Sequence, residues 1–328
     1  MPSHDPKTVR VSKEPNRLPP LVILLGPTAV GKTEISIQLA ERLNGEIVSA
    51  DSRLFYRGMD IGTAKPTLAE QQRVHHHLID VANPDQTWSL ALFQQEARLA
   101  IAAILSHGRL PLLVGGTGQY IRAAIQGWDL PKALPNPRLR AILEGWAAAI
   151  SQDGLHSRLG ALDPVAAAQI DPRNLRRTVR ALEVILITGG RFSEQRLSGQ
   201  LHYDCLQLGL ARPRPELYAR IDARIDAMLA GGLVDEVQGL LRQGYPPELP
   251  TLSAIGYREI IAYLQGKTSL EEAVMLIKRA TRVFVRRQAN WFKTNDPAIH
   301  WFYPESQTVE EMVAEITGWF PRKQSPMK

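Results

Sequence analysis

The sequence has very little cysteine and no long apolar run, and both shortages exclude classes of protein. A single cysteine, Cys205, stands among 328 residues, so the chain has neither an internal disulfide framework nor a cysteine-rich zinc module. No apolar stretch approaches the roughly 20 residues that span a bilayer. Residues 1–20 carry five prolines and mixed charge without the apolar stretch of a secretory signal. We therefore expect a cytoplasmic protein without a membrane partner, with residues 1–20 as a disordered tail.

What the chain does have is apolar material and a moderate excess of positive charge. Hydrophobic residues make up 44% of the sequence and charged residues 22%, enough for a large core, and the length favours about two domains. Lys and Arg number 39 against 33 Asp and Glu, a formal net charge of +6. A surplus of this size favours an anionic partner only if the charge is concentrated in one place.

Short apolar segments of strand length alternate with segments of helical periodicity, which is typical of a parallel α/β sheet. The expected strands are 21–25, 46–50, 109–114 and 206–210. The expected helices are 34–43, 93–105, 215–229, 234–242 and 270–293. Three prolines within 129–137 mark a boundary, and only helix signals follow from 138 to about 188. The pattern predicts a core of 21–128 and 204–303, an all-helical insertion domain at 129–203, and a C-terminal segment at 304–328.

A glycine-rich segment between the first strand and the first helix matches G-x-x-x-x-G-K-[ST]. In this pattern, successive backbone N–H groups surround a diphosphate, the lysine adds a charge, and the last hydroxyl can ligate Mg²⁺. The residues are Gly26, Pro27, Thr28, Ala29, Val30, Gly31, Lys32 and Thr33. The motif predicts a P-loop NTPase-like core with a diphosphate site, and Thr33 as a magnesium ligand.

The acid that would complete an ordinary ATPase site is missing from its expected place. The strand at 109–114 ends in Gly115-Gly116-Thr117-Gly118 instead of a carboxylate. Asp51 follows the second strand, and ligands of such sheets bind at the carboxyl ends of the strands. Asp51 and Thr117 are therefore expected at the diphosphate crevice, although Asp51 could also cap a helix and Thr117 could serve only in a turn.

Several segments together resemble the tRNA dimethylallyltransferases, also called tRNA isopentenyltransferases. The resemblance covers about 21–302 and is closest in the block from Asp51 to Pro66. The other matching segments are 76–80 (HHLID), 115–118 (GGTG), 180–184 (RALEV), 256–258 (GYR) and 286–288 (RRQ). The zinc finger of some eukaryotic members is absent, because the chain has one cysteine.

The resemblance implies that the P-loop binds dimethylallyl diphosphate with Mg²⁺. The dimethylallyl group would be transferred to N6 of adenine 37, beside the anticodon of tRNA. By the same resemblance Asp51 is the general base, Thr117 contacts the reacting region, and Lys32 and Arg258 stabilise diphosphate or tRNA charge. We expect a monomer that binds the tRNA anticodon stem-loop. The residues expected to contact tRNA are Asp51, Ser52, Arg53, Leu54, Thr117, Arg140, Arg176, Arg177, Thr178, Val179, Arg180, Gly256, Tyr257, Arg258, Arg279, Arg282, Arg286, Arg287 and Gln288.

Two positions depart from the family pattern. Leu54 stands where many members have Gln, so base recognition there would depend more on apolar contact. His75 stands where many members have Pro, which creates the run His75-His76-His77. Adjacent residues do not share a helix face, so we interpret this run as a loop or helix start and not as a metal site.

The positive charge is concentrated in two stripes. Residues 273–295 contain six basic residues and no acid, and their spacing predicts a helix with one basic and one apolar side, with Arg287 on the apolar side. In the insertion, Arg173, Arg176, Arg177 and Arg180 are expected opposite Leu175, Val179, Leu182 and Leu186. Basic stripes of this kind indicate phosphate contacts.

Three other functions account for part of the sequence. A P-loop kinase of a small metabolite would explain residues 26–33 but neither the insertion nor the stripes. An adenylate isopentenyltransferase acting on free nucleotide would not need the stripes. A non-catalytic RNA-binding protein would not need Lys32 and Thr33 in this context.

Overall fold

A computed structural model describes residues 18–128, 135–194, 201–305 and 307–320 of the chain. Most of the expected N-terminal tail, most of the proline boundary at 129–137, and residue 306 and the end of the C-terminal segment lie outside these residues. The chain divides into two compact units. The sheet unit comprises 1–88, 96–121 and 202–328, and the helical unit comprises 89–95 and 122–201.

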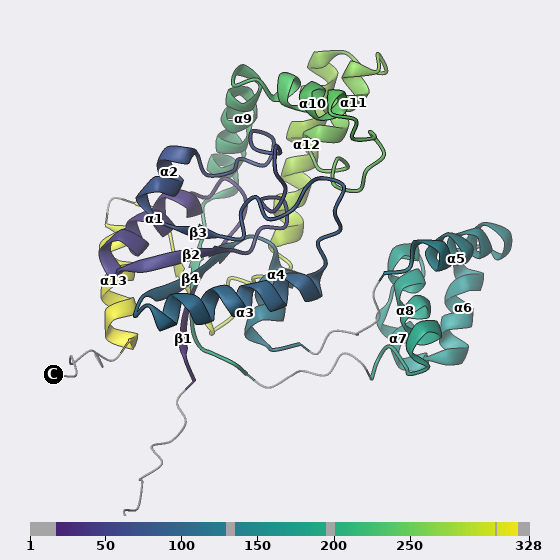
Figure 1. The fold of residues 1–328 in the computed structure, drawn as a ribbon, viewed down its shortest axis with the longest axis horizontal. Coiled ribbons are helices and arrows are strands. Elements are labelled where there is room, and N and C mark those ends of the chain that lie inside the picture. The colour runs from purple at the N-terminus through teal and green to yellow at the C-terminus, as the bar shows by residue number, and fades with distance from the viewer. Residues whose placement is uncertain (1–17, 129–134, 195–200, 306, 321–328) are drawn as a thin grey trace, which may run out of the picture. The chain divides into compact units, whose positions relative to one another are not determined.

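The sheet unit is built on a six-stranded sheet in which every pair of neighbours is parallel (Figure 1). Its order is β3-β2-β4-β1-β5-β6. The strands are β1 (Pro20–Leu25), β2 (Gly45–Ser49), β3 (His76–His77), β4 (Leu110–Gly115), β5 (Asp204–Leu210) and β6 (Ile299–Phe302). The predicted parallel α/β fold is confirmed. The two edge strands, β3 and β6, were missed because two- and four-residue strands leave almost no periodic signal.

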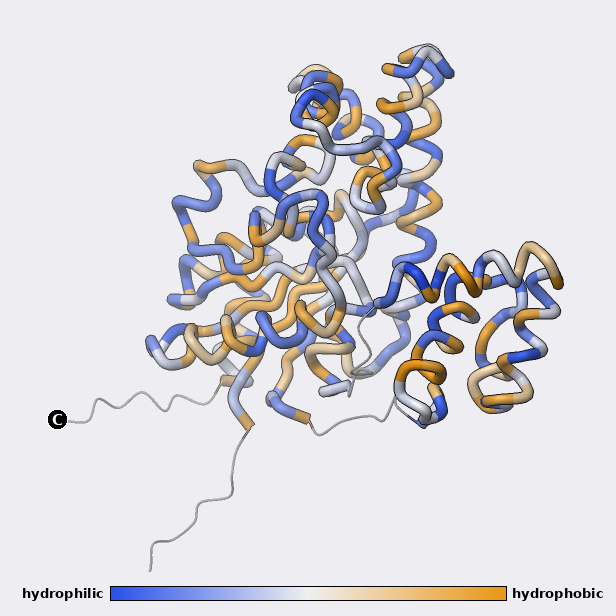
Figure 2. The backbone as a smooth tube through the Cα atoms, turned by 45° about the vertical axis from the view of Figure 1, so that its right-hand side comes forward, coloured by the Kyte–Doolittle hydropathy of each residue, from blue (hydrophilic) through white to orange (hydrophobic). Residues whose placement is uncertain are grey.

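The central strand explains why the sheet forms at this place. Leu21, Val22, Ile23, Leu24 and Leu25 of β1 are all fully buried, as expected for a parallel strand with both faces covered. Much of the chain at the centre of the sheet unit is correspondingly hydrophobic (Figure 2). Because the chain connects β1 to β2 across β4 and later adds β5 on the other side of β1, the carboxyl end of β1 lies where the strand order reverses, the usual ligand position in such sheets.

Helices surround this sheet. Helix α1 (Lys32–Leu43) packs on β1, β2 and β4, and α13 (Thr308–Trp319) packs on α1 and β5. Four helices pack on one another in a group of their own (Figure 1). They are α9 (Arg214–Ala230), α10 (Leu233–Arg242), α11 (Tyr257–Leu264) and α12 (Leu270–Gln288). Helix α2 (Leu68–Arg73) also belongs to the sheet unit, whereas α3 (Leu90–Ser106) and α4 (Gly118–Ile125) are each divided between the two units.

Helix α12 differs from its prediction at its C-terminal end. It ends at Gln288 instead of 293, because the chain turns there and Trp291 packs against Gly118, where a Cβ would lie 2.4 Å from the indole. The predicted position of Arg287 is wrong. Arg287 is exposed, and the buried residue at this end of the helix is Gln288.

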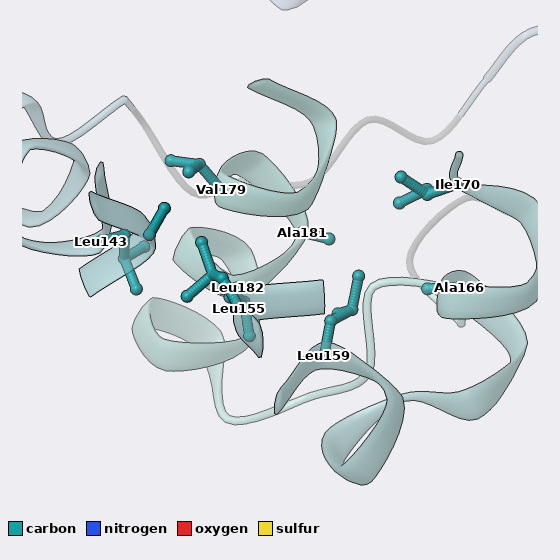
Figure 3. Close-up of a cluster of buried hydrophobic side chains, with 9 residues drawn as sticks. Leu143, Leu155, Leu159, Ala166, Ile170, Val179, Ala181 and Leu182 are labelled. Carbon is teal, nitrogen blue, oxygen red and sulfur yellow. The ribbon is translucent and has the colours of Figure 1, made fainter. Parts of the chain in front are cut away.

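The helical unit has its own core, formed by α5 (Pro137–Ile150), α6 (Gln152–Leu162), α7 (Pro164–Gln169) and α8 (Leu175–Thr188). Buried aliphatic side chains from all four helices meet in its interior (Figure 3). Each helix begins with a side chain that accepts a backbone N–H, a contact that stabilises a helix by about 1 kcal/mol. These capping residues are Asn136, Ser151, Asp163 and Asn174. Leu186, expected on the apolar side of α8, is instead 54% exposed.

Candidate active site

The predicted phosphate loop connects β1 to α1. Gly26 has φ of +153°, and a Cβ there would lie 2.7 Å from the carbonyl oxygen of Leu210, so only glycine fits. Gly31 precedes α1 with φ of +112°. The first N–H groups of α1 therefore face the loop, and the positive end of the helix dipole favours an anion there.

Lys32 is held inside this loop. Its Nζ donates to the carbonyl oxygens of Gly26, at 2.9 Å, and Pro27, at 2.7 Å. Burial lowers the pKa of Lys32 to about 8, and the negative charge of Asp51 opposes that shift only in part. An ammonium group that is desolvated before the ligand arrives has its charge available for a phosphate anion.

Gln288 connects the phosphate loop to the loop after β4. Its Oε1 accepts the N–H of Thr28 at 3.0 Å, and its Nε2 donates to the carbonyl of Gly116 at 3.0 Å. Gly116 leaves no room for a side chain, because a Cβ would lie 2.5 Å from that Nε2. Gln288 was expected to contact tRNA, but the structure places it 5% exposed between the two loops.

Asp51 lies just beyond the carboxyl end of β2, as predicted. Its Oδ1 accepts the N–H of Arg53 at 3.0 Å, which fixes the direction of the carboxylate. Lys32 and Arg224 are close enough for their charges to interact with it. Asp51 and Lys32 therefore belong to the same site, although 19 positions separate them in the sequence.

A cavity of about 880 Å³ unites these groups within the sheet unit. The predicted residues that line it are Thr28, Ala29, Gly31, Lys32, Thr33, Asp51, Ser52, Arg53, Leu54, Thr117, Gly256 and Arg258. Arg258 is exposed and donates to Glu259 at 2.5 Å. The large, open shape suits a ligand with both an anionic and an apolar part.

Two arginines of α9 complete the lining, and sequence reasoning missed both of them. Arg220 donates to the carbonyl of Ala29 at 2.8 Å, and Arg224 donates to the carbonyl of Ala64 at 3.5 Å. Burial lowers the pKa of Arg224, which Asp51 partly offsets. Their spacing of four residues places them on one face of α9, a signal that becomes visible only when the helix is known to border the cavity.

The loop at residues 60–64, of which residues 62–64 line the cavity, is held by one carboxylate. Glu236 accepts the N–H groups of Asp60, at 2.9 Å, Ile61, at 2.7 Å, and Gly62, at 3.1 Å. It also accepts the hydroxyl of Tyr257 at 2.6 Å. Burial, then Glu236, raises the pKa of Tyr257 far above its usual range, so this hydroxyl stays a donor. Tyr257 is fully buried; its side chain supports this loop and is not available to a partner at the surface.

Comparison with known proteins identifies the family. A sequence model described as IPP transferase matches residues 54–295. The chain belongs to the IPP transferase family. A tRNA dimethylallyltransferase of Roseiflexus sp. is 54% identical over 84% of this chain and 90% of its own length. The solved tRNA isopentenylpyrophosphate transferase of Bacillus halodurans has 42% identity and a TM-score of 0.68, covering 91% of this chain and 96% of its own. A eukaryotic dimethylallyltransferase, described as acting on tRNA, has 27% identity and a TM-score of 0.79, covering 94% and 81%.

In this IPP transferase fold, the basic residues predicted on α12 have different surroundings. Arg282 forms an ion pair with Asp222 of α9 and lies over the ring of Tyr218 at 5.5 Å. Lys278 pairs with Asp226 of α9 at 2.6 Å. Part of the predicted stripe is therefore paired with acids of α9.

Three other arginines of α12 are exposed, two from the predicted basic stripe and one that was expected on the apolar side. They are Arg279, Arg286 and Arg287. Their contact with tRNA stays a prediction.

In the helical unit, the predicted contact residues also divide into two groups. Arg176 and Arg177 are exposed at the start of α8. Thr178 and Val179 are buried in the unit's core, at 0% and 2% exposure, so their side chains are not available for a surface contact. Arg140 and Arg180 both pair with Glu183, which is fully buried.

Proposed function

We propose that this chain transfers a dimethylallyl group from dimethylallyl diphosphate to N6 of adenine 37 in tRNA, beside the anticodon. The observation that carries the proposal is the cavity shared by the phosphate loop and Asp51. Lys32 and the first turn of α1 form its anionic end, and Asp51 and Leu54 line the same space. A cationic diphosphate site next to a carboxylate is the arrangement that alkylation of an amine by a diphosphate ester needs.

The diphosphate end neutralises the leaving group. Lys32, Arg220 and Arg224 supply positive charge, and the N–H groups that open α1 supply hydrogen-bond donors. The hydroxyl of Thr33 lines the cavity in the first turn of α1, a hard oxygen donor of the kind that Mg²⁺ accepts together with substrate phosphates and water. Thr33 would hold the ion, and bound Mg²⁺ would neutralise charge on the departing diphosphate.

At the acceptor end of the cavity, one proton has to be removed from the amine. The C1–O bond of dimethylallyl diphosphate breaks, and diphosphate leaves with the bonding electron pair while N6 of adenine forms a bond to C1. The proton lost from N6 passes to the carboxylate of Asp51, which the Arg53 N–H orients at 3.0 Å. Thr117 and Leu54 line this part of the cavity and would position the base and the apolar prenyl group. The adenine has to leave its stack to enter such a pocket.

The substrate panel is the decisive experiment. Labelled dimethylallyl diphosphate is incubated with tRNA, with AMP, and without an acceptor, all in the presence of Mg²⁺. We expect label in tRNA alone, at the adenine beside the anticodon. Transfer only to AMP would support an adenylate prenyltransferase instead, and ATP consumption with a small metabolite would support a kinase.

Two variants make the result specific to the site. Asp51→Ala should abolish transfer while the variant still binds diphosphate, because the anionic end of the cavity is intact. Asp85→Ala is the matched control, since Asp85 is exposed and does not line the cavity. Equal turnover by both variants would contradict the role of Asp51.

A further inference from the structure

The edge of the sheet next to β3 carries a group of metal-ligating side chains that the reaction does not use. Glu46 of β2, His75 and His77 each offer one donor atom, and these atoms lie within 4.8 Å of one another. Because β3 pairs with β2 in parallel, with Ile47 opposite His76 and Val48 opposite His77, the backbone itself brings the three residues together.

Strand alternation separates this group from the active site. His76 and Ile47 line the cavity, and Nδ1 of His76 is hydrogen-bonded to the carbonyl oxygen of Val74 at 2.8 Å. His75 and His77, on either side of His76, project from the opposite face. Their rings meet edge to face with centroids 4.4 Å apart. The run of three histidines is therefore divided, with one ring at the cavity and two beside Glu46.

The carboxylate of Glu46 is well suited to be a ligand. Its side chain is only 7% exposed, and its Oε2 lies 2.6 Å from Nε2 of His77, while Oε1 accepts from Arg109 at 2.6 Å. Burial raises the pKa of Glu46, but the hydrogen bonds from His77 and Arg109 lower it more, so the net shift is downward. Arg109 contacts Oε1 and thereby fixes the orientation of the carboxylate, while Oε2 lies on the side of His77.

We propose that Glu46, His75 and His77 bind one Zn²⁺ or a similar transition-metal ion. Two imidazoles and one carboxylate are a ligand set that zinc accepts with water in the fourth position, and imidazole favours such metals over Mg²⁺. A metal ligand must offer an unprotonated nitrogen, so the ion would take the place of the hydrogen bond between Nε2 of His77 and Oε2 of Glu46. Arg109 acts as the outer partner that orients the carboxylate.

A bound ion would attach the shortest of the six strands more firmly to the sheet. β3 contributes only two residues to the sheet, and it is an edge strand. A bound ion would tie His75 and His77 to β2 and stabilise the folded state, because a ligand that binds only this state shifts unfolding. Chemistry in the cavity would not require the ion, since none of the three residues lines it.

The test is a Zn²⁺ titration of the chain without an affinity tag, in buffer that contains excess Mg²⁺. We expect one equivalent bound by calorimetry, and the visible absorption of a low-coordinate site when Co²⁺ replaces Zn²⁺. His75→Ala should weaken binding by at least about tenfold, since even losing an outer-shell partner costs that much. His75 is exposed, so this variant should fold normally, and His77→Ala should have the same effect.

His107→Ala is the matched control, because His107 is an exposed histidine outside the group. It should bind Zn²⁺ as the unchanged chain does. If the unchanged chain binds no Zn²⁺, or if His75→Ala and His77→Ala both bind it with unchanged affinity, the proposal is wrong.

Discussion

Asp51 in the sheet unit and Glu183 in the helical unit each have two basic side chains nearby, but their oxygens are used differently. Glu183 is fully buried, and its carboxylate accepts hydrogen bonds from Arg140 at 2.9 Å, from Arg180 at 2.6 Å and from the N–H of Asn136 at 2.7 Å. Asp51 accepts one backbone N–H, and it forms no ion pair within 4 Å among the described residues.

The difference separates a carboxylate that is saturated by structural partners from one that is free for the chemistry we propose. The charge of Glu183 is neutralised by partners inside the helical unit. Burial raises the pKa of Glu183, but the hydrogen bonds from Arg140, Asn136 and Arg180 lower it by more, so the net shift is downward. Asp51 faces an open cavity, where the positive charges of Lys32 and Arg224 interact with its carboxylate at a distance. A carboxylate can accept a substrate proton only if its neighbours leave an oxygen accessible.

The sharpest test of this comparison is Asp51→Asn. Loss of a general base slows turnover by roughly 10² to 10⁴-fold, so kcat should fall by that amount while the thermal midpoint stays close to that of the unchanged chain. Steady-state kinetics with tRNA and a thermal melt measure both. A kcat within a few-fold of the original would mean that another group removes the proton.

Glu183→Gln should have the opposite profile. Removing one partner of a buried ion pair costs about 3 kcal/mol, so the helical unit should unfold at lower denaturant concentration, as followed by circular dichroism. Turnover per folded molecule should change far less than in Asp51→Asn. Glu144→Gln is the control on the same unit, because Glu144 is exposed; equal stability loss in both variants would refute the structural role.

Lys32 predicts a pH dependence of anion binding. Its pKa is lowered to about 8, and only the protonated form attracts diphosphate. Relative to the Lys32→Arg variant measured at the same pH, the Kd for diphosphate should therefore rise above about pH 8, by up to about tenfold per pH unit. Lys32→Arg is the reference because arginine stays charged. A ratio of the two Kd values that does not change between about pH 7 and 9.5 would contradict the prediction.

The smallest expected effect concerns the exposed arginines of the helical unit. Arg176→Ala should weaken tRNA binding modestly and reduce the slope of log K against log salt by about 1. Arg173→Ala should change the slope less, because Arg173 is already paired with Asp171 at 3.0 Å. Identical slopes in the two variants would show that pairing does not distinguish these arginines.

The sequence predicted those parts of the site that local pattern determines. The phosphate loop follows from residue spacing, and Asp51 from its place after a strand. The parallel sheet follows from apolar runs such as 21–25. In each case the determining residues are neighbours in the chain, so periodicity and motif suffice.

The rest depends on pairings between distant segments. Glu46 meets His75 and His77 only because β3 pairs with β2. The interpretation of the histidine run as a loop or helix start was therefore wrong for His76 and His77, which form β3. The ion pair of Arg282 was missed because its partner Asp222 lies 60 positions away on another helix. No local pattern records such a contact, and the same holds for Glu236 and the loop at 60–62.

Gln288 has a mechanical consequence. Its one amide group bonds Thr28 in the phosphate loop and Gly116 in the loop after β4, and it is the last residue of α12. The three exposed arginines of α12 lie within nine positions of Gln288 on the same helix. A displacement of the end of α12 therefore either breaks one of these two amide hydrogen bonds or moves one of the two loops with it.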